Sequence, residues 1–124
     1  MLDEPMSPFT LSVDGSLATI TYVRETEDCA ADFMTVLNHA IDEGADNILL
    51  DKGDLKPAAY EDAVVVGKTV AAKLLRHDAR LAVVLRNDDH ETKIALAIAA
   101  QDGAAVLVGE STSEAYGWLR GDIR

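Results

Sequence analysis

The sequence predicts an α/β fold with the element order β-β-α-β-α-β-α-β-α and a mixed, mainly parallel sheet covered by helices. Three observations support this prediction. The chain opens with two segments in which polar and apolar residues alternate. Three short, continuous apolar runs follow, at residues 48–50, 81–85 and 104–108. Segments with apolar residues three and four positions apart separate these runs, and strands that alternate with helices imply right-handed crossovers and parallel pairing.

The two opening strands are expected to form an antiparallel hairpin. Phe9, Leu11 and Val13 alternate with polar residues, as in a half-buried strand. Asp14-Gly15 is a strong hairpin-turn signal, and alternation resumes over residues 17–23. Residues 1–7 are expected to be a flexible lead-in, and residues 8–121 a single domain.

The first helix is expected to begin in the acidic stretch 25–28, where negative charge meets the positive end of the helix dipole. Its apolar residues follow helical spacing. They are Ala30, Phe33, Met34, Leu37 and Ile41. Gly44 is expected to end this helix, since glycine favours the left-handed conformation found there.

The stretch 47–75 is predicted to be the central unit of the chain, a buried strand followed by a charged turn and a long helix. The run 48–50 suits a strand covered on both faces. Gly53 permits a turn with positive φ, and Pro57 fits the first turn of a helix that extends to Arg76. The apolar face of this helix recurs three and four apart. It comprises Tyr60, Ala63, Val64, Gly67, Val70, Ala71 and Leu74.

Two features of this segment disfavour a helix. The run 64–66 is three valines, which alone favour a strand. We still predict a helix, because the flanking segments are rich in helix formers and the periodicity spans the run. Gly67 in mid-helix costs about 1 kcal/mol relative to alanine, which a close approach of the helix to the sheet would justify.

The remaining elements follow the same alternation. A strand is expected at 81–85 and a helix after it, capped by Asp88 or Asp89 and ending near Gly103. The apolar residues Ile94, Ala95, Ile98 and Ala99 follow the spacing of this short helix. A third buried strand is expected at 104–108. The last helix is expected to open with a capping box of Ser111 and Glu114, to pack through Ala115, Trp118 and Leu119, and to end at Gly121.

Composition restricts the class of partner. The 124-residue chain carries a net charge of −11. Nucleic acids and anionic membrane surfaces are therefore not expected partners, because both require clustered Lys and Arg. Cys29 is the single cysteine, so no intramolecular disulfide can form, which fits a reducing compartment. With no signal peptide visible in residues 1–10, a cytoplasmic location is expected.

The element order, with the segments FTLSVDG, SLATITYV, NILLDKGDLKPAAYEDAVVVGKTVAAKLL, RLAVVL and DGAAVLVGESTSEAYGWL, resembles the STAS-like bacterial domains related to the anti-sigma-factor antagonists and SpoIIAA. The resemblance implies a regulatory domain that binds another protein, such as a signalling or anti-sigma-type regulator. In that family a Ser or Thr after the third strand is phosphorylated. Here no Ser or Thr lies between Asp51 and Val66, so phosphorylation at this turn is not expected.

Few residues suggest a catalytic or metal-binding role. The acidic turn 87–91 lacks the spacing of a calcium loop, so a solvated, capping turn is favoured over a metal site. His39 and His77 are expected at the surface, and Cys29 is expected to pack. For Lys52, a surface ion pair with Asp51 or Asp54 is favoured over a functional lysine. The aromatic residues Tyr60, Tyr116 and Trp118 fit an interaction patch or a core equally well.

The sequence therefore favours a non-enzymatic, STAS-like protein-interaction module without metal or cofactor. Its contact surface is expected at the turn and helix start after the third strand, where open α/β sheets place their sites. The residues expected to bind the partner are Asp51, Lys52, Asp54, Lys56, Tyr60 and Asp62. The alternatives are a carrier of a small apolar ligand or lipid, and a small enzyme using Asp51, Lys52 or His90. A homodimer through the hairpin or an apolar helix face is left open.

Overall fold

A computed structural model describes residues 9–23, 29–53, 63–85 and 90–121, and the expected α/β fold is confirmed. The strands and helices alternate as predicted. They are β1 (Phe9–Asp14), β2 (Leu17–Tyr22), α1 (Cys29–Asp42), β3 (Asn47–Gly53), α2 (Ala63–Arg76), β4 (Arg80–Leu85), α3 (His90–Gln101), β5 (Ala105–Gly109) and α4 (Thr112–Arg120). The predicted lead-in 1–7, helix start at Pro57 and cap at Asp88 or Asp89 lie outside the described residues.

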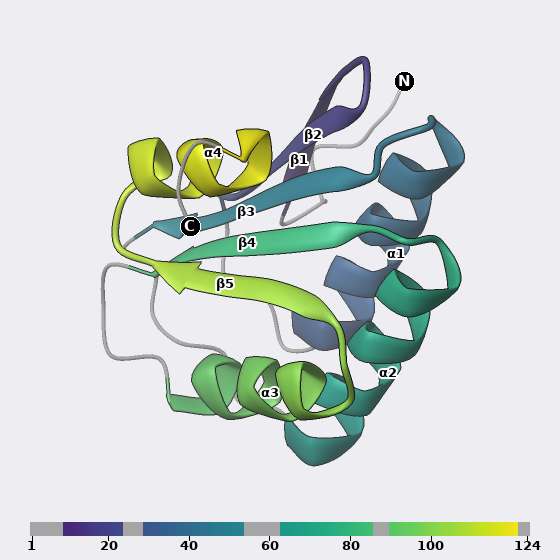
Figure 1. The fold of residues 1–124 in the computed structure, drawn as a ribbon, viewed down its shortest axis with the longest axis vertical. Coiled ribbons are helices and arrows are strands. Elements are labelled where there is room, and N and C mark those ends of the chain that lie inside the picture. The colour runs from purple at the N-terminus through teal and green to yellow at the C-terminus, as the bar shows by residue number, and fades with distance from the viewer. Residues whose placement is uncertain (1–8, 24–28, 54–62, 86–89, 122–124) are drawn as a thin grey trace.

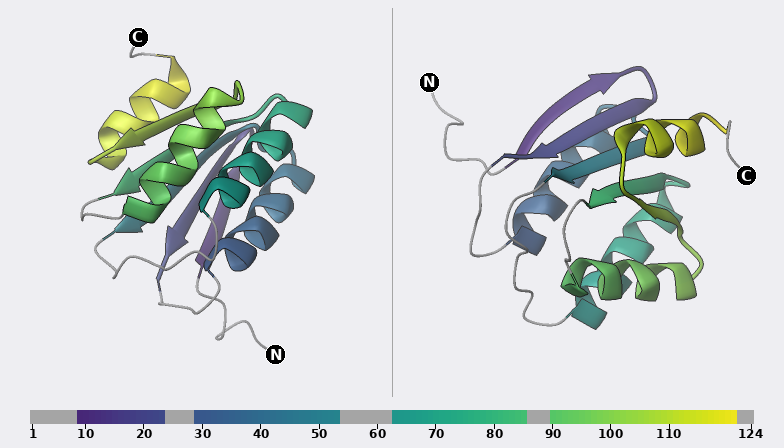
Figure 2. Two further views of the ribbon diagram at one scale, coloured as in Figure 1. Left: turned by 90° about the horizontal axis from the view of Figure 1, so that it is seen from below. Right: turned by 90° about the vertical axis from the view of Figure 1, so that its left-hand side faces the viewer.

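The strands form one five-stranded sheet in the order β1-β2-β3-β4-β5. β1 pairs with β2 antiparallel, and the other neighbours pair in parallel. Helices α1, α2 and α3 cover one face of the sheet, whereas α4 lies on the other (Figures 1 and 2). This placement follows from right-handed crossovers that all turn to the same side.

Each face of the sheet has its own hydrophobic core. The larger core joins the sheet to α1, α2 and α3 and includes Ile20, Leu37, Ile48 and Leu74. The smaller core joins α4 to Leu49, Ala82 and Val84. Because β3 and β4 contribute to both cores, their apolar runs are continuous rather than alternating. β1 and β2 instead keep an alternating pattern, with polar residues on the face of the sheet that bears α4.

The opening hairpin has the expected form. Asp14 pairs with Leu17, and Gly15 between them has a φ of 65°, a conformation that favours glycine. The second strand is one residue shorter than predicted. It ends at Tyr22, and Val23 is 48% exposed.

The packing of α2 corrects two predictions. Val64 is 42% exposed, and Val66, four residues before Val70, contacts the larger core instead. Gly67 does mark a close approach, but to α3 rather than to the sheet. A Cβ on Gly67 would lie 2.3 Å from the carbonyl oxygen of Ala95. Glycine is therefore required by helix–helix packing.

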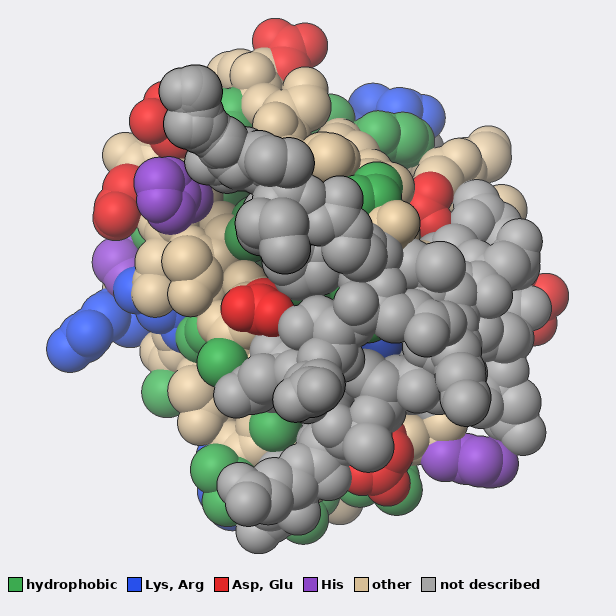
Figure 3. All heavy atoms as spheres, turned by 180° about the vertical axis from the view of Figure 1, so that it is seen from behind, with side chains coloured by type: hydrophobic (Ala, Val, Ile, Leu, Met, Phe, Trp, Pro, Cys, Tyr) green, Lys and Arg blue, Asp and Glu red, His purple; other side chains and the backbone are tan. Residues whose placement is uncertain are grey.

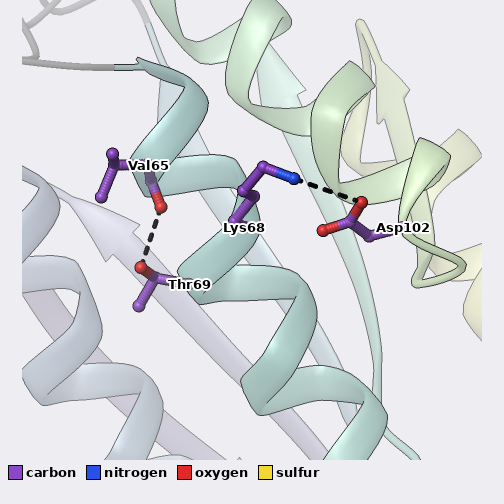
Figure 4. Close-up of polar contacts among 4 residues, drawn as sticks. All are labelled: Val65, Lys68, Thr69 and Asp102. Atoms are coloured by element: carbon purple, nitrogen blue, oxygen red, sulfur yellow. Dashed lines mark hydrogen bonds and ion pairs between the residues drawn. The ribbon is translucent and has the colours of Figure 1, made fainter.

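A surface contact also joins α2 to the end of α3. Lys68 Nζ lies 3.8 Å from the carboxylate of Asp102, and Thr69 Oγ1 donates to the carbonyl of Val65 at 2.8 Å (Figure 4). The Lys68 side chain is 61% exposed, so this ion pair contributes little. The backbone contact at Gly67 is therefore the stronger constraint on how α2 and α3 cross.

The buried residues of α3 are Thr92, Ala95, Leu96 and Ala99, whereas Ile94 is 44% exposed. Thr92 contacts a buried polar group that is described below. One prediction on burial was wrong. The last strand is an edge strand and not a buried one. Ala105 and Val108 are exposed, since no strand lies beyond β5 in the sheet.

The caps of α4 follow the predicted pattern. Ser111 Oγ accepts a hydrogen bond from the backbone N–H of Glu114 at 3.1 Å, and Glu114 Oε1 accepts one from the N–H of Glu110 at 3.3 Å. Gly121 ends the helix with a φ of 83°. Arg80 of β4 donates to the carbonyls of Trp118 and Leu119 in the last turn of the helix, where backbone carbonyls lack their usual i+4 donors. These contacts fix α4 against the sheet.

The close approach at Gly67 predicts that Gly67→Ala destabilises the protein, although alanine favours helices by about 1 kcal/mol. The added methyl meets the backbone of Ala95, and overpacking of this kind costs about 1–3 kcal/mol. Urea unfolding should therefore show a lower free energy of unfolding. Val65→Ala, at a 56% exposed position of the same helix, should change that free energy by less than about 0.5 kcal/mol. A Gly67→Ala protein more stable than wild type would contradict the packing described here.

Candidate functional site

The carboxyl end of β3 is the candidate site. β3 is the central strand, and it is parallel to both neighbours. The carboxyl ends of β2, β3 and β4 therefore lie at one edge of the sheet, together with the beginning of α3. The pairing of β3 with β4 shifts between Asp51 and Gly53, so that Lys52 and Gly53 lie against Leu85. Such bulges are frequent next to functional sites, because they change the direction of a side chain.

Lys52 is buried at this bulge. It is 3% exposed, and its Nζ donates a hydrogen bond to Thr92 Oγ1 at 3.1 Å. The same Nζ lies 5.4 Å from the centroid of the Tyr22 ring, within range of a cation–π interaction. Lys52 is therefore buried and not at the surface as predicted. Three elements meet at this ammonium group: β2 through Tyr22, β3 through Lys52 and α3 through Thr92.

The energetics explain why these contacts matter. Removing an ammonium group from water costs several kcal/mol unless hydrogen bonds and other charges compensate. The hydroxyl of Thr92 and the face of Tyr22 both favour the cation, and Thr92 is itself 5% exposed. A buried ammonium with directional partners fixes the geometry of the strand end more narrowly than apolar contacts do.

Asp51 points the other way. It pairs in register with Thr21 of β2 and Val84 of β4, and it is half-buried. Successive side chains of a strand face opposite sides of the sheet, so Asp51 shares the face of Leu49, on which α4 packs. The structure thus separates Asp51 from Lys52. Of the other residues expected to bind a partner, Asp54, Lys56, Tyr60 and Asp62 lie outside the described residues.

A small apolar cavity adjoins Lys52. Its volume is about 30 Å³, and Phe33, Leu50, Val70 and Leu96 line it together with Lys52 and Thr92. This is room for roughly one water molecule. Sites for drug-sized ligands have volumes of about 300–1,000 Å³, so the cavity as it stands does not hold a fatty chain.

Titratable residues do not gather into a metal site in the ranges that the structure describes. No group of three His, Cys, Asp or Glu residues there is placed to hold an ion. His39 and His77 are exposed, as predicted, and so is His90 at the start of α3. Asp and Glu side chains are dispersed over the face seen in Figure 3 rather than clustered. None of the helices in the described ranges is both long and apolar enough to span a membrane.

A second hollow lies at the opposite edge of the sheet. Its volume is about 330 Å³, and its lining includes Ser16, Leu17, Asn47 and Tyr116. Tyr116 and Thr19 share a hydrogen bond between their hydroxyl groups at 3.0 Å. Both Tyr116 and Trp118 pack on the smaller core, and the Arg80 guanidinium lies 5.1 Å from the Trp118 ring centroid. These aromatic residues therefore hold α4 in place, as expected of a core.

Sequence reasoning missed Thr92 and Tyr22 as partners of Lys52. Tyr22 is the last residue of a strand with alternating burial. Its position beside the end of β3 follows only from the strand order, which places β2 next to β3. The prediction for this helix used only the apolar residues within 94–99 and did not consider Thr92. A signal was nonetheless present, because a polar residue at helical spacing from Ala95, Leu96 and Ala99 requires a polar partner inside the protein.

Comparison with known proteins supports the fold. The structure is similar to the NMR structure of the protein TM1081, with a TM-score of 0.65 and 17% sequence identity over 97% of this chain and 93% of that chain. At this identity the similarity shows the fold alone. A scan against protein-family models and a search of curated proteins both gave no match. Membership in the STAS-like family therefore stays a prediction.

The Lys52–Thr92 contact predicts a specific energetic coupling. Thr92→Val keeps the shape of the side chain but removes the acceptor, and it should lower the free energy of unfolding by about 1–3 kcal/mol. In a Lys52→Met background, which retains an apolar stem of similar length, the same substitution should cost less. A double-mutant cycle in urea should give a coupling of about 1 kcal/mol or more. Additive effects of the two substitutions would show that the hydrogen bond contributes nothing.

Proposed function

We propose that this chain is a non-enzymatic regulatory domain of the STAS-like kind that binds another protein through the sheet edge where β3 ends. The observation that carries the proposal is the fixed geometry of that strand end. Lys52 is held between Thr92 and Tyr22 on one face of the sheet, while Asp51 remains partly exposed on the other. A binding surface with little freedom before binding loses little conformational entropy on binding.

The position of the strand supports this location. In open α/β sheets, ligands and partners bind beyond the carboxyl ends of the parallel strands. β3 lies at the centre of the sheet, and Asp54 follows its last residue directly. Lys56, Tyr60 and Asp62 continue the proposed surface along the sequence, adding both charge and an aromatic residue of the kind enriched at interfaces.

The charge of the chain defines the kind of partner. With a net charge of −11, the domain attracts a protein that presents a basic surface, and electrostatic attraction raises the rate of association. Binding should therefore weaken as the salt concentration rises, because salt screens exposed charges. The single cysteine supports a cytoplasmic partner, since the domain forms no intramolecular disulfide.

The carrier of a small apolar ligand is the second candidate. It is favoured by the apolar lining around Lys52 and Thr92, which resembles a ligand pocket with a few polar groups. Its volume of about 30 Å³ is the argument against it, because any lipid would have to displace core side chains. The protein-binding proposal needs no such rearrangement and is therefore preferred.

Charge reversal at the strand end tests the proposed surface. Wild-type protein and an Asp51→Lys variant would be immobilised and exposed to a lysate of the source organism, and the dissociation constant of each captured protein would then be measured. We expect Asp51→Lys to weaken binding at least about tenfold. Asp54→Lys should act in the same direction.

The matched control is Asp14→Lys, which makes the same charge change at an exposed position of the hairpin turn, on the opposite edge of the sheet. Its effect should stay within about twofold, because a charge far from the contact acts only through screened fields. Circular dichroism would verify that each variant is folded. Equal weakening by Asp51→Lys and Asp14→Lys, or no effect of Asp54→Lys, would rule out this surface.

A further inference from the structure

The outer edge of β5 is an open strand edge. β5 is the last strand of the sheet, and no hydrogen bond joins the outer side of Ala105–Gly109 to another part of the chain that the structure describes. Figure 1 shows β5 in front, with α4 above it and α3 below it, and neither helix crosses its edge. Within the described ranges, the backbone N–H and C=O groups along this edge face no other strand and can pair with one.

The sequence of β5 provides none of the usual protection for such an edge. Proteins that remain monomeric commonly place a charge, a proline or a bulge on an edge strand. The strand AVLVG contains no charged residue and no proline, and its pairing with β4 is regular. Val108 is 39% exposed. The opposite edge strand differs, because β1 exposes the polar residues Thr10, Ser12 and Asp14.

We propose that two copies of this chain pair through β5 in an antiparallel manner, forming one continuous ten-stranded sheet across a two-fold axis. A row of backbone N–H and C=O groups pairs along its whole length with another extended strand, which identifies the proposed occupant as a strand. A second copy fits because the edge complements itself. When Leu107 lies on the axis, Val106 is opposite Val108 of the partner subunit, and no like charges face each other.

Charge and symmetry both favour this arrangement over other self-association. Each chain carries a net charge of −11, so two copies repel except where their surfaces lack charge, and β5 is such a place. Two-fold pairing of β5 with itself also closes the assembly. Pairing of β5 with β1 of another copy would instead continue as an open filament, and the exposed Asp14 and Ser12 of β1 oppose it.

Analytical ultracentrifugation of the full chain tests this proposal. Wild-type protein should sediment as a dimer, at twice the 13.3 kDa mass of the chain, in the micromolar range. Val108→Lys places a charge on the edge and should raise the dimer dissociation constant at least about tenfold. Val65→Lys, at a 56% exposed position of α2, is the matched control and should leave that constant unchanged. A wild-type monomer at all concentrations, or a Val108→Lys dimer as tight as wild type, would overturn the proposal.

Hydrogen exchange locates the interface independently of any substitution. The amides of residues 105–109 that face outward should exchange more slowly as the protein concentration rises, because pairing protects them. Amides of β1 and α2 should not respond. A dimer whose concentration-dependent protection falls on the hairpin or on α2 would equally exclude the β5 interface.

Discussion

The buried ammonium group of Lys52 is the constraint on which the arrangement of the sheet edge depends. It joins the end of β3 to the first turn of α3 through Thr92 and to β2 through Tyr22. An uncompensated charge in this position would be strongly destabilising, so the three elements must keep their relative positions. Thr92 is buried at this contact, whereas Ile94 of the same helix is 44% exposed.

The unequal covering of the sheet explains where the protein presents free surface. Three helices pack on the larger core on one face, whereas α4 alone packs on the other. Within the described residues, the polar side of the hairpin is exposed, the outer edge of β5 has no neighbouring strand, and Asp51 at the carboxyl end of β3 is half-buried. One proposed interface lies at the carboxyl end of the central strand β3, and the other lies along the outer side of the edge strand β5.

Much of the fold is contained in local patterns. The Asp14-Gly15 turn, the continuous runs of β3 and β4 and the capping box of Ser111 and Glu114 each depend on neighbours in sequence, and each was predicted correctly. The errors concern long-range packing. Gly67 was assigned to a contact with the sheet because sequence spacing does not reveal which neighbour approaches a helix. β5 was expected to be buried because an apolar run does not indicate whether a strand is central or at an edge.

The position of the candidate site stays a prediction, and the structure corrects the placement of Lys52 within it. The rule for open α/β sheets located it after the third strand, yet Asp51 and Lys52 were expected on one surface, and Lys52 is buried. The pairing of Lys52 with a residue 40 positions away on α3 cannot be predicted from the sequence near Lys52, although the polar Thr92 on the buried side of its helix signals a polar partner.

Competitive labelling of lysine amines tests the burial of Lys52 most directly. Native protein would be treated briefly with an acetylating reagent, and the modification of each lysine would be quantified by mass spectrometry. Lys68, whose side chain is 61% exposed, should react at least about tenfold faster than Lys52, which reacts only when the structure opens. In denaturant the two should react alike. Equal labelling of Lys52 and Lys68 in the native protein would contradict the central claim.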